Sequence, residues 1–259
     1  MKRLFHRFGL DVKRVGSLVW QAELGPLEVA LTVLLSERKF VNIVQIGAND
    51  GRVNDPIYPF ATRYPDRTHL LLIEPQAQLI PSLSENYEFH TSKTIVRVAV
   101  GAEGILDLFS VSPDAWPYLN VPYARGWPEY RAPTGITSVD KAHVARWLNQ
   151  YLDSRISVED AIVRIQVESK ALVDIIDEAE YGRFVDVLQV DTEGFDDQVI
   201  YHSSLDLLRP PIINFEHENL DEERVRTLFR YLRHRGYVLI RDRRDTLCLR
   251  TTPPNQPVR

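Results

Sequence analysis

The sequence predicts an α/β fold in which a mostly parallel β-sheet is covered by helices on both faces. Short apolar runs of strand length alternate along the chain with segments whose apolar residues recur at helical spacing. Such alternation is typical of parallel sheets, whose strands are buried on both sides. Near the end of the chain the order changes, because two apolar runs flank the polar turn Arg241–Asp245 and predict an antiparallel hairpin.

Each predicted element follows from its own residues. Five apolar runs bounded by polar or turn residues are the predicted parallel strands: Val41–Ile46, His69–Glu74, Ile95–Val100, Val185–Asp191 and Pro211–Glu216. Segments with apolar residues at helical spacing are the predicted helices: Gln78–Asn86, Ala171–Glu180 and Asp221–Arg235. The last of these begins at an Asp suited to capping and stops before Gly236.

The segments outside this pattern define the expected domain organisation. Residues 1–36 are predicted as an N-terminal helical extension, since Pro26 suits a first helical turn and apolar residues follow at helical spacing. Residues 37–252 form the main domain. Within it, residues 113–153 are predicted as a lid-like insertion, because their first part is irregular and rich in Pro and aromatic residues. A purely structural insertion packed by its own aromatic residues explains this composition equally well. Residues 253–259 are predicted as a flexible tail.

Composition excludes several classes of protein. The net charge of −5 argues against nucleic-acid binding by charge. Cys248 is the only cysteine, which rules out an internal disulfide and Cys-rich zinc sites. No apolar run approaches the roughly 20 residues of a membrane span. We therefore expect a cytoplasmic protein with no membrane span, in which the N-terminal helices offer a possible homodimer contact.

The first candidate site is the turn Gly47–Gly51 (GANDG) at the end of the first predicted strand. Glycines let the backbone turn sharply and approach a ligand closely, and ligands of open α/β sheets bind at the carboxyl ends of strands. Glu74 ends the next strand, 23 residues after Gly51, where an acid can hold two ribose hydroxyls. Neither GxxxxGK[ST] nor GxGxxG is present, which disfavours a phosphate loop and a dinucleotide site.

Acidic residues follow the two later strands. Asp191 and Glu193 lie in VDTEGFD, and Glu216 and His217 lie in NFEHEN at the end of the following strand. Clustered acids rarely serve core packing, so we expect them to cap a helix, orient a hydroxyl or bind a hard cation. Asp191 and Glu216 are candidate Mg²⁺ ligands. His217 is a candidate general base, although a loop histidine without a task is an equally good reading.

With these motifs in place, the sequence resembles the FkbM-type family of S-adenosylmethionine-dependent methyltransferases over roughly residues 40–250. The stretches that carry the resemblance are VNIVQIGANDG, LLLIEP, VRVAVG, VDVLQVDTEGFD and IINFE. The resemblance implies a Rossmann-like class I methyltransferase fold with a seven-stranded sheet. It also implies S-adenosylmethionine as cofactor and a small-molecule hydroxyl acceptor such as a sugar or a natural product.

The resemblance further implies roles for individual residues. Those around the methionine part of the cofactor would be Gln45, Gly47, Ala48, Asn49 and Gly51. Those around its nucleoside would be Glu74 and Pro75 at the ribose, with Ala99 and Val100 at the adenine. Asp191 would lie near the reacting methyl group, and the candidate catalytic residues are Asp191, Glu193 and His217.

One residue departs from the pattern that the resemblance implies. Class I methyltransferases often carry an acid at the position of Gln45, where it helps to hold the amino group of the cofactor. Two alternatives stay open beside the O-methyltransferase. One is a nicotinamide-dependent dehydrogenase on the same sheet, and the other is a non-catalytic partner protein that keeps the fold, for which Gln45 is the best support.

Overall fold

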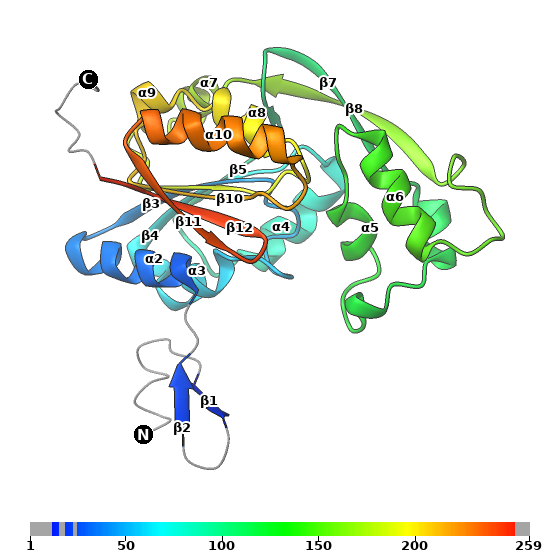
Figure 1. Ribbon diagram of the computed structural model, residues 1–259, viewed down its shortest axis with the longest axis horizontal. Helices are drawn as coiled ribbons and strands as arrows, with labels where there is room; N and C mark the ends of the chain where they lie inside the picture. Colours follow the sequence, from blue (N-terminus) through cyan, green and yellow to red (C-terminus); the bar gives the residue numbers. More distant parts are fainter. Residues whose placement is uncertain (1–11, 16–18, 23–24, 252–259) are drawn as a thin grey trace.

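A seven-stranded sheet forms the centre of the computed structural model, which describes residues 12–15, 19–22 and 25–251 (Figure 1). The strand order is β11-β12-β10-β9-β3-β4-β5. Neighbouring strands from β10 to β5 run parallel, whereas β12 is antiparallel to both β10 and β11. The strand bounds are Val41–Ile46 for β3, Thr68–Ile73 for β4, Lys93–Val96 for β5, Val187–Val190 for β9, Ile212–Glu216 for β10, Tyr237–Asp242 for β11 and Asp245–Arg250 for β12. The predicted parallel sheet with a terminal antiparallel hairpin is confirmed.

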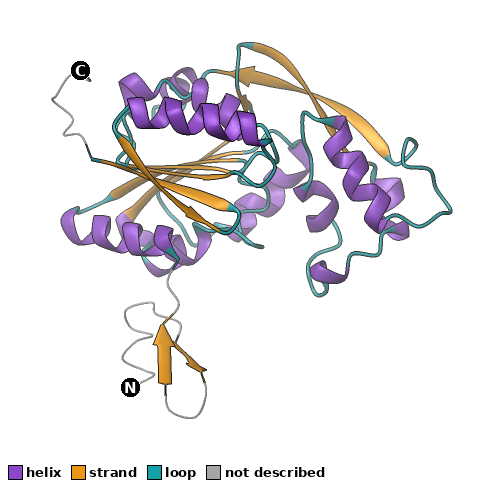
Figure 2. Ribbon diagram, viewed as in Figure 1, coloured by secondary structure: helices purple, strands orange, loops and turns teal. Residues whose placement is uncertain are grey.

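Helices cover both faces of this sheet, as the long apolar strands require (Figures 1 and 2). Successive residues of β3 enter different cores, Ile43 on one face and Val44 on the other. The first face packs on α2 (Pro26–Glu37), α3 (Tyr58–Arg63) and α4 (Ile80–Asn86). The other packs on α7 (Leu172–Glu178), α8 (Asp196–Tyr201), α9 (Leu205–Leu208) and α10 (Glu222–His234). Short 3₁₀ turns, η1 (Pro65–Arg67) and η2 (Ala77–Leu79), flank β4.

A second sheet, of three strands, was not expected from the sequence. It consists of β6 (Ala99–Val100), β8 (Ile162–Lys170) and β7 (Gly104–Val111), in the order β6-β8-β7. The apolar run Ile95–Val100, expected as one strand, is divided between the two sheets: β5 pairs with β4, and β6 pairs with β8. A small separate core of Ala99, Leu108 and Val167 holds the second sheet together.

The predicted insertion lies between β7 and β8. Its helical segments are η3 (Pro113–Tyr118), η4 (Pro122–Ala124), α5 (Arg131–Gly135) and α6 (Lys141–Tyr151). The long strands β7 and β8 extend beyond the central sheet, and α5 and α6 lie beside its edge (Figure 1). Ala115, Val144 and Leu148 belong to a small core within the insertion. The segment therefore folds around its own apolar residues and also borders the central sheet.

The N-terminal region differs in part from the expected helical extension. Val12–Val15 (β1) and Val19–Ala22 (β2) pair as antiparallel strands where helix was predicted. Three of these eight residues are valines, whose β-branched side chains favour strand. The helix expected after Pro26 is present as α2, but Leu31, Leu34 and Leu35 bury it in the main core, so it belongs to the domain. The expectations for residues 1–11, 16–18, 23–24 and 253–259 lie outside the described residues.

The carboxyl ends of β3, β4 and β9 meet at one edge of the sheet, where backbone hydrogen bonds join the turns that follow them. The N–H groups of Gly47 and Ala48 donate to the Ile73 carbonyl at 3.0 and 3.1 Å, and the Asp191 N–H donates to the Ile46 carbonyl at 3.0 Å. This edge is where bound molecules are expected in an open α/β sheet. Among the described helices, none is long and apolar enough to cross a membrane.

Candidate active site

The glycines of the first turn are required by close packing around it. A Cβ at Gly47 would lie 1.8 Å from the carbonyl oxygen of Asp191, and one at Gly51 would lie 2.5 Å from Leu83 and 2.6 Å from Tyr87. Both glycines also have positive φ, +76° and +66°, which L side chains rarely adopt. The motif therefore brings the backbone of β3 directly against β9 and α4, and Asn49 is left between Gly47 and Gly51 at the sheet edge.

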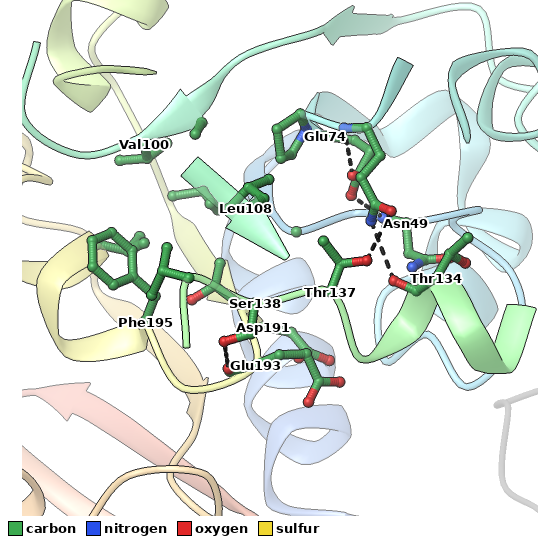
Figure 3. Close-up of a pocket in the computed structure, with 18 of the residues that line it drawn as sticks. Asn49, Glu74, Val100, Leu108, Thr134, Thr137, Ser138, Asp191, Glu193 and Phe195 are labelled. Atoms are coloured by element: carbon green, nitrogen blue, oxygen red, sulfur yellow. Dashed lines mark hydrogen bonds between the residues drawn. The ribbon is translucent and has the colours of Figure 1, made fainter. Parts of the chain in front are cut away.

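Glu74 locks this turn to the end of β4. Its Oε2 accepts a hydrogen bond from the Asn49 N–H at 2.8 Å, and its Oε1 accepts one from the Gln76 N–H at 2.9 Å. Burial raises the pKa of Glu74, and these two hydrogen bonds work against that increase. Figure 3 shows Glu74 and Asn49 side by side at one end of the cavity. The acid predicted from the sequence is thus positioned by the turn that it was expected to assist.

One cavity brings together seven of the predicted cofactor residues. Those that line it are Gly47, Asn49, Glu74, Pro75, Ala99, Val100 and Asp191. Apolar side chains from β7 and α8 and from the segments that precede them complete the wall, namely Val98, Leu106, Leu108, Phe195 and Val199. Val100 and Phe195 lie at the end of the cavity away from Glu74 (Figure 3). The cavity therefore has one polar end and one apolar end.

Gln45, Ala48 and Gly51 were also expected at the cofactor but do not line this cavity. Side chains alternate along a strand, so Ile46 faces the cavity and Gln45 points away from it. The Gln45 side chain is 3% exposed, and its Nε2 donates to Asp55 Oδ2 at 2.5 Å. Asp55 Oδ1 accepts the N–H groups of Ile57 and Tyr58 at the start of α3. The structure thus places Gln45, which was expected at the amino group of the cofactor, in the support of the loop behind the turn.

The acids after β9 and β10 form a compact cluster. Asp191, Glu193 and Glu216 each present a carboxylate oxygen within 4.8 Å of the others. Burial, followed by the charges of Glu193 and Glu216, raises the pKa of Asp191. Burial and the Glu193 charge raise the pKa of Glu216 to about 8, against the effect of Arg244, which lies 2.7 Å from Glu216 Oε1. The cluster therefore holds protons near neutral pH that separate carboxylates would release.

Two further residues, Asn219 and Asp196, order this cluster. Asn219 Nδ2 donates to Glu193 Oε2 at 2.9 Å and to Glu216 Oε2 at 2.6 Å. Asp196, fully buried, accepts the Thr192 hydroxyl at 3.1 Å and the Gly194 N–H at 3.3 Å. Burial raises the pKa of Asp196 to about 7. The second acid of DTEGFD thus faces the cluster, whereas the third folds the turn that presents it.

His217 does not join the acidic cluster. Its Nδ1 lies 3.1 Å from the Thr246 hydroxyl, and its Nε2 accepts a hydrogen bond from Arg241 Nε at 3.3 Å. Neither described cavity that touches Asp191 includes it, and it borders a separate hollow together with Arg226. Burial and the Arg241 charge lower the pKa of His217. Because Glu216 and His217 are adjacent at a strand end, their side chains diverge, so the structure places His217, the predicted general base, apart from the acidic cluster.

His143 is a functional candidate that the sequence did not reveal. It lies on α6 in the insertion, and its Nε2 is 3.5 Å from Glu193 Oε2. It carries no recognisable motif, and only the docking of the insertion onto the sheet edge brings it to the acids. A position on a helix does not by itself say which neighbour that helix faces.

A second cavity adjoins the first. Both are lined by Arg131, Gly135, Asp191 and Glu193. Its lining also includes aromatic residues of the insertion, namely Tyr123, Trp127, Trp147 and Tyr151. These rings contact one another, with centroids 5.0 Å apart for Trp147 and Tyr151, and Trp147 Nε1 donates to the Tyr123 hydroxyl at 2.9 Å. The predicted lid segment thus forms an aromatic wall facing the carboxylates.

Several solved structures are distantly similar to this chain. The Methanococcus jannaschii fibrillarin pre-rRNA processing protein is 9% identical, with 93% of this chain and 82% of that chain covered and a TM-score of 0.41. The precorrin-6y C5,15-methyltransferase of Geobacter metallireducens is 9% identical, with 92% of both chains covered and a TM-score of 0.39. The citrinin polyketide synthase CMeT domain is 9% identical, with 88% of this chain and 52% of that chain covered and a TM-score of 0.42.

Sequence comparison is more specific. No curated protein matches the chain. The methyltransferase FkbM domain, however, matches residues 45–239, which span the GANDG turn, Glu74, DTEGFD and most of the strands that position them. This match covers well over half of the 259 residues. The chain therefore belongs to the family of FkbM-domain methyltransferases.

Proposed function

We propose that the protein transfers a methyl group from S-adenosylmethionine to a hydroxyl of a small molecule, a sugar or glycan unit or a natural product. The observation that carries the proposal is the meeting of two cavities at one acidic edge, where Asp191 and Glu193 line both. A ligand in each cavity would have its reacting end beside these carboxylates. A transfer between two bound molecules needs such a shared point, because it holds the reacting atoms in proximity.

The first cavity matches the parts of the cofactor that the class I fold implies. Its apolar end, with Val100, Leu108 and Phe195, suits an adenine ring. Each oxygen of Glu74 accepts one backbone N–H, which leaves further lone pairs for ribose hydroxyls. Asp191 lies at the other side of the same cavity, where a carboxylate favours positive charge. When bound, the cofactor supplies a methyl group already activated on its sulfonium sulfur.

The second cavity supports a sugar-like acceptor. Large amphipathic rings such as Tyr123, Trp127 and Trp147 offer flat apolar surface with a polar edge. The facing carboxylates accept hydrogen bonds from hydroxyls, and Arg244 at the rim donates them. A molecule with apolar ring faces and several hydroxyl groups satisfies both walls.

The acidic cluster supplies a place for the acceptor proton. An acceptor hydroxyl must lose its proton as its oxygen takes the methyl group, and a base with a pKa near the working pH is the most effective. Burial and repulsion from neighbouring acids bring Glu216 to a pKa of about 8 and raise that of Asp191. We therefore assign proton removal to this cluster, with Asp191 beside the cofactor cavity and His143 as a further proton acceptor next to Glu193.

The predicted Mg²⁺ ligands, Asp191 and Glu216, belong to the same acidic cluster, and the Mg²⁺ site stays a prediction. Asp191, Glu193 and Glu216 offer three oxygen donors within 4.8 Å of one another, and oxygen donors are those that Mg²⁺ prefers. A divalent cation there would reduce the repulsion among the acids and lower the pKa of a bound hydroxyl.

The direct test joins binding and turnover. S-adenosylmethionine is titrated calorimetrically into the purified protein, and methyl transfer to a panel of mono- and oligosaccharides is then measured with Mg²⁺ and with EDTA. We expect saturable binding and transfer that falls by about 100-fold or more in Asp191→Asn. Absence of binding heat for S-adenosylmethionine, together with no inhibition of methyl transfer by S-adenosylhomocysteine, would contradict the proposal. Equal rates of methyl transfer with Mg²⁺ and with EDTA would contradict the predicted Mg²⁺ site and leave the methyltransferase proposal standing.

A further inference from the structure

Arg131 ties the insertion to the turn that follows β3. It begins α5, and its Nε and Nη2 donate to the Val53 carbonyl at 3.2 and 3.0 Å. Its Nε also lies 3.5 Å from Asp50 Oδ1, and the hydroxyl of neighbouring Tyr130 donates to Asp50 Oδ2 at 3.3 Å. With 13% of its side chain exposed, Arg131 is held where the insertion crosses the sheet edge.

The guanidinium remains available to the cavities on its other side. Its described hydrogen bonds use Nε and Nη2, whereas Nη1 lies against Gly135, where a Cβ would approach it to 2.3 Å. Gly135 and Arg131 both line the cofactor cavity and the acceptor cavity. A glycine at this position therefore leaves room for the guanidinium at the junction of the two.

Arg131 brings a positive charge to a cavity whose other charged residues are acids. Among the described residues that line the cofactor cavity, Arg131 is the only Lys or Arg, against the three carboxylates of Glu74, Asp191 and Glu193. Burial raises the pKa of both Glu74 and Asp191, and the charge of Arg131 acts against that increase at each. The methionine part of S-adenosylmethionine brings an ammonium, a sulfonium and one carboxylate. The acids can match the two cations, but the carboxylate needs a positive partner.

We infer that Arg131 binds the methionine carboxylate of S-adenosylmethionine and so couples cofactor binding to the position of the insertion. The inference rests on the proposed function. Arginine suits the task because its planar fork can give a carboxylate parallel hydrogen bonds while its other edge stays on the Val53 carbonyl. Since Tyr130 and Arg131 belong to the insertion, a filled cofactor cavity would also hold the aromatic wall of the acceptor cavity in place.

The experiment compares two ligands that differ in the carboxylate alone. S-adenosylmethionine and decarboxylated S-adenosylmethionine are titrated calorimetrically into the wild-type protein, Arg131→Met and Arg131→Lys. We expect Arg131→Met to weaken S-adenosylmethionine binding by roughly 10-fold to 100-fold, the range for a hydrogen bond to a charged group, and the decarboxylated compound by less than about twofold. Arg131→Lys should recover part of the loss, because it keeps the charge and loses the fork. Arg146→Met, an exposed site in the same insertion, is the matched control and should bind both compounds as the wild type does.

The outcomes separate the inference from the proposed function. An equal loss for both compounds in Arg131→Met would mean that Arg131 only holds the fold together, and no loss for either would place the carboxylate elsewhere. Both results overturn the inference and leave the methyltransferase proposal standing. Failure of the wild-type protein to bind either compound overturns the two together.

Discussion

For the substitution Gln45→Glu, the sequence alone and the structure predict different results. If Gln45 held the amino group of the cofactor, an acid there would tighten binding. In the structure Gln45 instead donates to the half-buried carboxylate of Asp55 at 2.5 Å. The substitution would replace this donor with a second carboxylate away from water. We expect a loss of about 2–4 kcal/mol in the free energy of unfolding at pH 7.5, from the lost hydrogen bond to a charged group and the burial of like charges.

The loss should depend on pH in a definite direction. Burial raises the pKa of Asp55 in the wild type, and a neighbouring carboxyl raises it further in the variant. When folding raises the pKa of a carboxyl pair, the pair is protonated at low pH in both the folded and the unfolded protein, and the folded protein is not destabilised there. Stability is lost as pH rises from the unfolded value of about 4 through the raised value. The difference between wild type and Gln45→Glu should therefore be small at pH 5 and large at pH 8.

Urea unfolding of four proteins measures the effect. Alongside the wild type and Gln45→Glu, the double variant Gln45→Glu with Asp55→Asn exchanges the amide and the acid, and should recover at least about 1 kcal/mol. Gln78→Glu makes the same change at an exposed position and should shift stability by no more than about 0.5 kcal/mol. Unchanged stability in Gln45→Glu, or tighter binding of S-adenosylmethionine, would refute the assignment of Gln45 to the supporting loop.

Three other predictions follow from the site. Glu74→Gln should weaken S-adenosylmethionine binding by about 10-fold in calorimetry, because a neutral amide accepts ribose hydroxyls less well than a carboxylate and keeps only one of the two backbone hydrogen bonds, with an unchanged circular dichroism spectrum as the check on folding. His143→Ala should lower kcat by about 10-fold or more, whereas His217→Gln should leave it within about twofold; the reverse order would restore His217 as the base. In EDTA, the wild type should lose stability between about pH 5 and pH 8, because Glu216, with a pKa near 8, keeps a proton in the fold that the unfolded chain releases. Glu216→Gln should flatten this slope in urea unfolding at several pH values, and an identical slope would contradict it.

Much of the cofactor cavity was readable from sequence because its residues are local to strand ends. The GANDG turn, Glu74 and DTEGFD each follow a buried strand directly. Parallel strands bring their carboxyl ends to one edge, so residues at those ends meet whatever the details of packing. The glycines were predictable for a related reason, since only glycine tolerates both the positive φ and the approach of the neighbouring backbone.

Residue identity at a strand end does not settle which way the side chain points. Gln45 and His217 each adjoin a residue that does face a cavity, Ile46 and Glu216, and alternation sends both to the other side. The second sheet was not predicted either, because β7 and β8 are separated in the chain by the insertion, and strand pairing across such a distance leaves no local pattern in the sequence.

The sequence by itself determined the central sheet, its helices and the turn, acid and strand-end motifs that lie within the methyltransferase FkbM domain. Only the tertiary structure decided what lies opposite them: the aromatic wall, His143 against Glu193, and Arg131 over the turn after β3. The physical reason is the range of the interactions. Periodicity and turn residues act between near neighbours in the chain, whereas the docking of residues 113–153 on the sheet edge depends on contacts such as Tyr130 with Asp50, 80 residues apart.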